Sequence, residues 1–249
     1  MRSVRILAAT GAALAGCSQL SEPTSPGLNT SVLPDAVVEQ ECDPSGGYGF
    51  VCGVQNAEDL VLVPETEWII ASSMAPGGAI YLIDAERKSA TDLYPAEGAR
   101  VEYDVANYPF CPGQPDLDNF ITHGLNLRVG PEDRQTLYAV SHGAREAIEV
   151  FDVNMADGTP DLTWIGCVLM PEGLAANSVA SFSDGALVAT VLLYPDRTFD
   201  DMISGEPTGA VYQWSSGDEG FTLIEGTELP GNNGSEEQSK SPRPDQIIQ

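Results

Sequence analysis

The stretch AIYLID, residues 79–84, shows the pattern on which the fold prediction rests: a short apolar run that ends in an aspartate. Similar runs return as IEVFD at residues 148–152 and as AVYQW at residues 210–214. Each is the third in a group of four short apolar segments separated by Gly, Pro, Asn and Asp, with no long helical period between them. Repeated groups of four short strands are typical of β-propeller blades, whereas a β-sandwich does not explain the shared position of the three similar strands. We therefore predict an all-β protein built from four-stranded propeller blades.

The repeated pattern divides residues 41–234 into three predicted blades. Because a propeller closes with about four to eight blades, we expect a partial, truncated propeller. The polar residues 235–249 are expected to form a disordered tail where a further strand would begin. The predicted strands are 59–63, 68–72, 79–84 and 90–94 in the first blade, 125–129, 136–141, 147–153 and 162–169 in the second, and 178–182, 186–193, 209–214 and 221–225 in the third.

The N-terminus has the pattern of an export signal. A basic start is followed by the apolar, small residues 6–16 and then by Cys17, and this arrangement is typical of a signal peptide at 1–16. LAGC at 14–17 resembles the lipobox of bacterial lipoproteins, which implies a lipid on Cys17 and a flexible tether at 17–40. We expect an exported protein of the cell envelope that meets the membrane through this lipid anchor only. The alternative is an ordinary secretory signal with an unrelated cysteine.

The charge balance excludes one class of partner. The chain has 37 acidic and 11 basic residues, for a net charge of −26. Nucleic-acid binding needs a basic footprint, so the sequence predicts no nucleic-acid partner. The negative net charge also argues against docking on anionic lipid. Most of the surplus carboxylates suit a solvated, exported surface, and some are available to divalent cations.

Four cysteines remain after Cys17, and their even number in an oxidising compartment permits two disulfides with three connectivities. Cys42 and Cys52 form the most favourable local pair, because the Gly-containing loop between them can fold back. Cys111 and Cys167 would then pair with each other. The cysteine spacing and the near absence of histidine argue against a zinc site.

The chain has only two histidines, and each lies close to a predicted strand end. His123 comes just ahead of strand 125–129, and His142 follows the adjacent strand 136–141. In a propeller both strand ends can approach the central channel, where a histidine pair can act as a general base on water. The alternative is that both are structural histidines at strand ends.

Three loops with oxygen-bearing side chains stand at matching positions, each ahead of the first strand of a blade. They are residues 56–59, 176–178 and 231–234. Carboxylate and amide oxygens are the ligands that Ca²⁺ prefers. Asn and Asp are also ordinary turn residues, but the recurrence of such loops at one position in the repeat favours a metal site.

Several short stretches between residues 56 and 234 occur in a specific order and spacing. They are EDLVLVP at 58–64, IIASS at 69–73, HGL at 123–125, LYAVSH at 137–142, IEVF at 148–151, Asn177, and NG at 233–234. In this combination the chain resembles the paraoxonase/arylesterase family and, more loosely, the gluconolactonase and senescence-marker-protein propellers.

The resemblance implies a six-bladed propeller with two calcium ions in its central tunnel, of which this sequence would supply about three blades. One ion is catalytic and polarises the carbonyl of a lactone or ester. By position, Glu58, Asn177 and Asn233 correspond to ligands of the catalytic ion. Asp59 and the main-chain carbonyl of Leu125 correspond to ligands of the structural ion.

The resemblance also implies a function. His123 and His142 correspond to the histidine dyad of the family, with His123 nearer to the attacking water. The expected activity is calcium-dependent hydrolysis of a small-molecule ester or lactone, and the sequence leaves the oligomeric state open. Ser178 departs from the family, which has aspartate at this position. This departure and the short chain favour the alternatives: a non-catalytic propeller lipoprotein that binds a ligand or partner, or an inactive truncated product.

Overall fold

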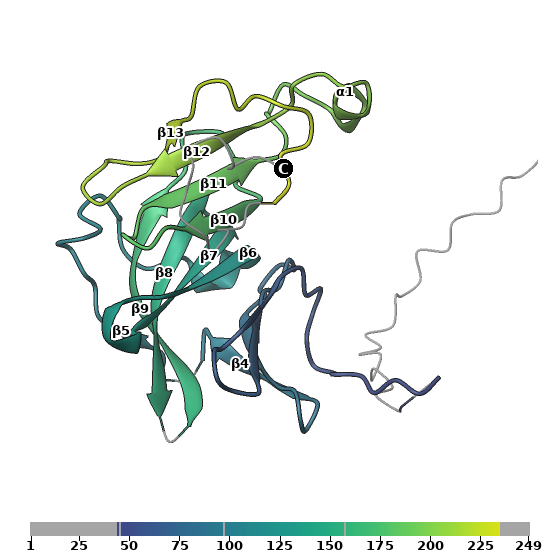
Figure 1. Ribbon diagram of the computed structural model, residues 1–249, viewed down its shortest axis with the longest axis vertical. Coiled ribbons are helices and arrows are strands. Elements are labelled where there is room, and N and C mark those ends of the chain that lie inside the picture. Colours follow the sequence, from purple (N-terminus) through teal and green to yellow (C-terminus); the bar gives the residue numbers. More distant parts are fainter. Residues whose placement is uncertain (1–43, 45, 97, 157, 235–249) are drawn as a thin grey trace, which may run out of the picture. The chain divides into compact units, whose positions relative to one another are not determined.

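The computed structural model of the chain describes residues 44, 46–96, 98–156 and 158–234 (Figure 1). Within these residues nearly all regular structure is β-strand, so the predicted all-β class is confirmed. The predicted signal peptide at 1–16, the tether at 17–40 and the tail at 235–249 lie outside the described residues, as do Cys17 and Cys42.

The strands form three sheets, in the orders β1-β2-β3-β4, β5-β9-β8-β7-β6 and β10-β11-β12-β13. Neighbouring strands are antiparallel, except that β5 pairs with β9 in parallel. No sheet in the described part of the chain closes on itself. The strands are β1 (Leu60–Leu62), β2 (Trp68–Ala71), β3 (Ile80–Asp84), β4 (Ser89–Tyr94), β5 (Arg100–Val101), β6 (Phe120–Val129), β7 (Gln135–Gly143), β8 (Ala147–Ala156), β9 (Thr159–Leu169), β10 (Ser178–Ser181), β11 (Leu187–Val191), β12 (Ala210–Trp214) and β13 (Thr222–Leu223).

Each predicted strand overlaps a strand of the structure, and each predicted group of four lies within one sheet. The main differences are additional short elements: β5, the 3-10 turns η1 (Leu117–Asn119) and η2 (Pro131–Asp133), and the helix α1 (Phe199–Ile203). The start of α1 is capped by Thr198 and Asp201, each of which bonds to the backbone of the other. No helix within the described residues is long and apolar enough to cross a membrane.

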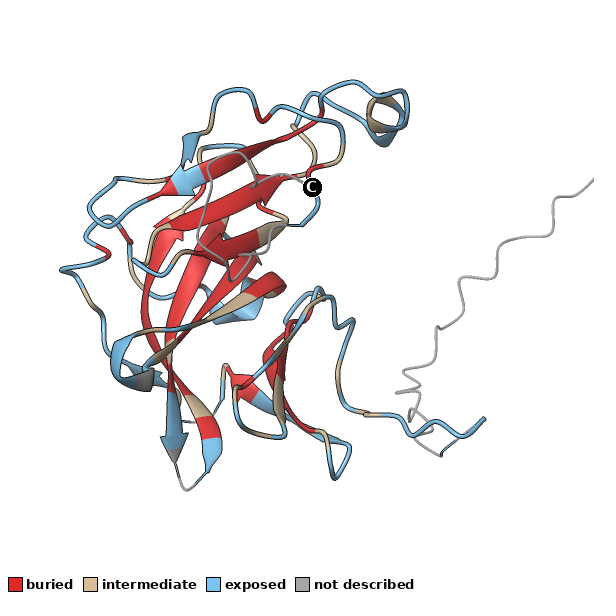
Figure 2. Ribbon diagram, viewed as in Figure 1, coloured by how far each residue is buried: buried red, intermediate tan, exposed pale blue. Residues whose placement is uncertain are grey.

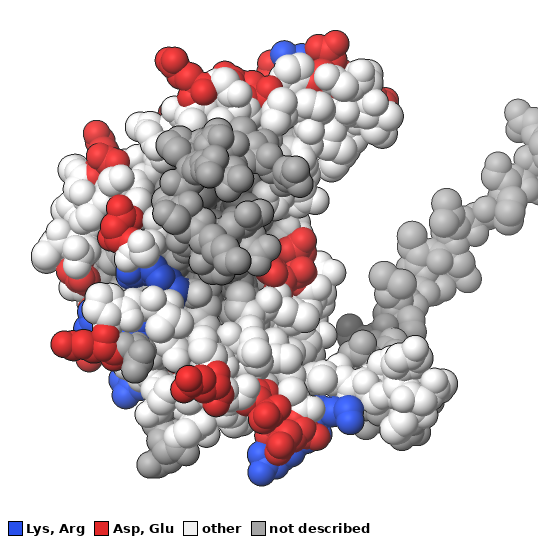
Figure 3. All heavy atoms as spheres, in the orientation of Figure 1, with Lys and Arg blue, Asp and Glu red and all other residues white. Residues whose placement is uncertain are grey.

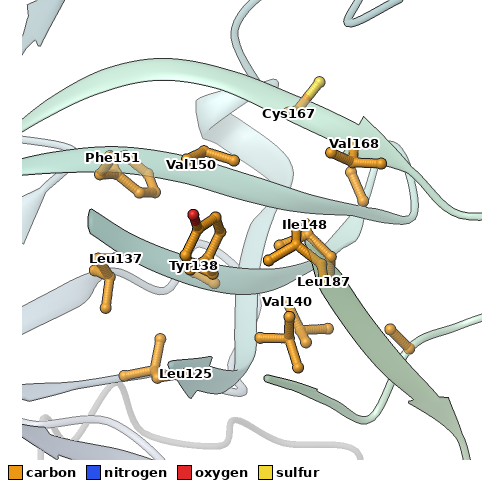
Figure 4. Packing of buried hydrophobic residues seen from close by; sticks show 14 of the residues in the cluster. Leu125, Leu137, Tyr138, Val140, Ile148, Val150, Phe151, Cys167, Val168 and Leu187 are labelled. Atoms are coloured by element: carbon orange, nitrogen blue, oxygen red, sulfur yellow. The ribbon is translucent and has the colours of Figure 1, made fainter. Parts of the chain in front are cut away.

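The main core draws buried side chains from all three sheets (Figure 2). Residues 136–141 of β7 are all buried. Because successive side chains of a strand point to opposite faces, such a run requires that both faces of the sheet be covered. Figure 4 shows Val140, Ile148 and Leu187, from β7, β8 and β11, packed close together. Strand β7 is therefore covered on both sides, as is β3, whose five residues are all buried.

A disulfide joins the loop before η1 to β9. Cys111 and Cys167 are bonded, with their Cα atoms 5.2 Å apart, so one of the two predicted pairs is confirmed. Cys52 is also disulfide-bonded, and its predicted partner Cys42 lies outside the described residues.

A buried ion pair lies beside this disulfide. Glu149 of β8 is completely buried, and its Oε1 accepts hydrogen bonds of 2.9 and 2.7 Å from the guanidinium of Arg145. Its Oε2 accepts a bond of 2.8 Å from the indole of Trp164. Burial raises the pKa of the Glu149 carboxyl, and the charge of Arg145 opposes that rise. The carboxylate thus bonds to both the β7–β8 turn and β9.

The surface agrees with the acidic composition. On the face drawn in Figure 3, Asp and Glu side chains are spread over several segments and do not gather into one patch. This distribution is typical of a solvated surface.

Candidate functional site

A pocket of about 590 Å³ lies beside β1, β6 and β10, which are edge strands of the three sheets. Its walls come from the residues just before β1, from the middle of β6, from the start of β10 and from the last described loop. All five residues that the sequence analysis assigned to calcium line this pocket. They are Glu58, Asp59, Leu125, Asn177 and Asn233.

Asp59 links the start of β1 to β6. Its Oδ2 accepts a hydrogen bond of 2.7 Å from the main-chain N–H of Leu125, and its Oδ1 accepts one of 2.8 Å from the N–H of Leu60. Leu125 thus meets Asp59 through its N–H, a contact that the sequence did not predict. The two bonds fix the orientation of the carboxylate at the pocket wall.

Asn177 links the start of β10 to the last described loop. Its Nδ2 donates to the main-chain oxygen of Asn233 at 2.6 Å and to the Asn233 Oδ1 at 2.7 Å. The hydroxyl of Thr190 donates to the same main-chain oxygen at 3.1 Å. The two bonds from Asn177 bring together two asparagines that are far apart in the sequence, and both use its Nδ2 and not its side-chain oxygen.

The close approach of β6 to β10 depends on Gly124. A Cβ atom at this position would lie 2.7 Å from the main-chain oxygen of Asn177 and 2.8 Å from the Cα of Ser178. Such contacts are too short for any side chain, so glycine is needed where the two strands meet at the pocket.

The two histidines form a direct pair at the edge of this pocket. The Nδ1 of His123 and the Nε2 of His142 are 3.2 Å apart. Both histidines were predicted just outside strands, and both positions are wrong. His123 lies within β6, at an irregularity between Thr122 and Leu125, and His142 lies within β7. A β-bulge changes the direction of a side chain, and bulges are frequent beside functional sites. His123 lies at this bulge and contacts His142 of β7.

Two carboxylates extend the histidine pair at its ends. The Nε2 of His123 lies 3.3 Å from Oε1 of Glu58. At the other end, the Nδ1 of His142 lies 2.6 Å from Oε2 of Glu146. Burial lowers the pKa of His123 below its ordinary value, and the negative charge of Glu58 opposes this shift. The sequence analysis did not identify Glu146; its only signal is a charged residue four positions after a histidine, next to a predicted strand.

A second pocket, of about 400 Å³, opens beside the histidines. It contains both His123 and His142, and it shares Asn177 with the first pocket. The remaining walls are mainly apolar, from Met74, Ile121, Ala175, Ala176, Leu192 and Leu193. A polar pocket and an apolar pocket thus meet at Asn177, with the histidine pair beside their junction.

The donors present suit a hard cation better than a transition metal. Among the described residues, no group of three or more His, Cys, Asp and Glu side chains is arranged to hold a metal ion. The polar pocket offers two carboxylates, from Glu58 and Asp59, with amide oxygens from asparagine. Carboxylate and carbonyl oxygens suit calcium or magnesium, whereas zinc and copper favour nitrogen and sulfur.

The chain matches no protein-family model, and no curated protein shows significant similarity to it.

Proposed function

We propose that the protein is a calcium-dependent hydrolase of lactones or aryl esters. The observation that supports this most strongly is the meeting of two features at one place. Oxygen-bearing residues beside edge strands of three sheets line one pocket, and a hydrogen-bonded histidine pair lines the apolar pocket that adjoins it at Asn177.

The donor set supports calcium as the cofactor. Glu58 and Asp59 bring two negative charges to the polar pocket, and a divalent cation would offset their repulsion. Asn177 and Asn233 add neutral oxygens of the kind that calcium accepts among its six to eight or so ligands. When bound, calcium acts as a Lewis acid on a carbonyl oxygen and lowers the pKa of water.

The residues of the chain supply proton transfer and substrate binding. His123 takes a proton from water at Nε2, the nitrogen that faces Glu58. His142 accepts a hydrogen bond from the other nitrogen of His123 and so stabilises the charge that develops there. The apolar pocket takes the hydrocarbon part of the substrate, because its walls offer few polar groups.

We further propose that the sheets are blades of a propeller. β6 contacts both β1 and β10, and each of these three is an edge strand of its own sheet, so the three sheets approach one another at these edges as blades do at their inner strands. Each sheet also contains four consecutive antiparallel strands, as a blade does. The lipid on Cys17 remains part of the proposal and rests on the sequence of residues 1–17.

One observation favours a second candidate function, a non-catalytic binding protein. Ser178 lines the polar pocket at the position where the resembled family has a charged ligand. A pocket with one carboxylate fewer would bind calcium more weakly. Such a protein would bind a small molecule without turning it over.

The proposal predicts calcium-dependent turnover. The purified protein should hydrolyse aliphatic lactones or phenyl esters in about 10 mM Ca²⁺, which exceeds the Kd of roughly 0.1–1 mM that is typical of extracellular calcium sites. It should lose this activity in excess EDTA and regain it when calcium is restored. Initial rates over a panel of lactones and phenyl esters measure this. Calcium binding without turnover of any of these compounds would instead support the binding protein.

A further inference from the structure

The carboxylate of Glu146 is placed to determine which nitrogens of the histidine pair carry protons. Glu146 lies in the turn between β7, which ends at Gly143, and β8, which begins at Ala147. Its Oε2 is 2.6 Å from the Nδ1 of His142, a distance typical of a strong hydrogen bond to a charged acceptor. The Glu146 side chain is about one-third exposed and that of His142 is 14% exposed, so the contact is only partly screened by water.

The turn that carries Glu146 is firmly attached to its surroundings. The main-chain oxygen of Glu146 accepts a hydrogen bond of 3.0 Å from the main-chain N–H of Met170. The neighbouring Arg145 is bonded to Glu149 and to the main-chain oxygen of Gly113. Ser141 and Ala147 pair across the hairpin directly beside it. A side chain on such a support can hold an imidazole in one orientation.

The positions of the protons follow from which groups can donate. An ionised carboxylate only accepts hydrogen bonds, so the proton between Glu146 and His142 belongs to Nδ1 of the histidine. A neutral His142 then has a lone pair at Nε2, which faces the Nδ1 of His123 at 3.2 Å. His123 must donate from its Nδ1, so its own lone pair lies at Nε2.

The lone pair of His123 consequently faces the polar pocket. Glu58, 3.3 Å away, is also an acceptor when ionised, and the two atoms are too close for a water molecule to lie between them. A water that donates to both has to lie beside this contact, on the pocket side, and a general base at His123 would deprotonate that water.

We propose that Glu146 is a positioning residue. By holding the proton of His142 on Nδ1, it makes Nε2 of His123 the basic nitrogen that faces the polar pocket. Glu146, His142 and His123 thus form a carboxylate–histidine–histidine relay, in which each member orients the next. The effect on turnover rests on the proposed hydrolase function, whereas the effect on the tautomer does not.

The test uses the fact that the chain has only two histidines. Labelling with ¹⁵N-histidine gives two imidazole spectra, which His123→Gln and His142→Gln assign. At about pH 8, where an ordinary imidazole is neutral, long-range ¹H–¹⁵N correlation spectra should show both histidines protonated on Nδ1. In Glu146→Ala, His142 should shift toward the Nε2–H form that free histidine prefers. Glu146→Gln keeps an oxygen acceptor and should retain the wild-type tautomers.

Turnover provides the second readout. In Glu146→Ala, kcat should fall about 10- to 100-fold with little change in KM, as for other carboxylates that orient a functional histidine. Glu146→Gln should recover much of this loss. Glu67→Ala removes an exposed carboxylate that lines neither pocket and should change neither readout.

The outcomes separate this proposal from the proposed function. A wild-type His142 in the Nε2–H form, or tautomers that do not change in Glu146→Ala, would overturn the positioning role of Glu146. Wild-type protein with the expected tautomers but no turnover would leave Glu146 as the orienting group and overturn the hydrolase.

Discussion

Replacing His123 with glutamine should reduce kcat/KM for the lactone or ester substrate by about 10²- to 10⁴-fold, the usual contribution of a general base. Glutamine can still bond to His142, but it cannot take a proton from water. The side chain of His123 is only 10% exposed, so bulk water is a poor substitute for the missing base. Initial rates at saturating calcium give the ratio.

The matched control for this variant is Glu67→Gln, at an exposed position that lines neither pocket. It should retain full activity. The calcium-induced stabilisation of His123→Gln should remain close to that of the wild-type protein, because His123 is not a proposed calcium ligand. If His123→Gln retained its activity, the histidine pair would not be the base, and the proposed reaction would need another proton acceptor.

Replacing Glu149 with glutamine should destabilise the fold by about 3–5 kcal/mol, the usual cost of removing one partner from a buried ion pair. The guanidinium of Arg145 is only 17% exposed and would lose its counter-charge, while Glu149 itself is fully buried. Glutamine has nearly the same shape, so the loss reports the charge and not a cavity. Urea-induced unfolding measures the change in the free energy of unfolding.

Two further variants test whether the stability lost in Glu149→Gln comes from the unpaired charge of Arg145. Glu102→Gln changes an exposed carboxylate and should alter the free energy of unfolding by less than about 0.5 kcal/mol. The double variant Arg145→Met with Glu149→Gln removes both charges, keeps an oxygen acceptor for the indole of Trp164, and should recover much of the stability. A loss below about 1 kcal/mol in Glu149→Gln would mean that Arg145 finds water or another partner when the carboxylate charge is removed.

The strands of the protein are well predicted from sequence because their signal is local. Residues 137–140 form a short apolar run that indicates a buried strand, and they lie in the middle of β7. The short strand β5 is not predictable in this way, because its two residues are too few to show an alternation of apolar and polar side chains. Its parallel partner β9 is about sixty positions away, and no local pattern specifies such a pairing.

The sequence predicts which residues belong to the candidate site, but it does not predict the contacts that they make. The recurrence of oxygen-bearing loops indicates that Glu58, Asn177 and Asn233 belong to one pocket. The bulge that places His123 inside β6 depends on pairing with β7, and it has no sequence signature of its own. The contact of Glu146 with His142 depends on the geometry of a tight turn. Both features therefore require the tertiary structure.

The most direct measurement of the central claim, that the polar pocket binds calcium, is thermal unfolding of the purified protein in EDTA and in about 1 mM Ca²⁺. A cation that binds only the folded state at about 100 times its Kd adds about 2.7 kcal/mol of stability. We predict that calcium raises the Tm of the wild-type protein and of Glu67→Gln, and that Glu58→Gln loses most of this shift. A wild-type Tm that calcium leaves unchanged, or an equal shift in Glu58→Gln, would contradict the account.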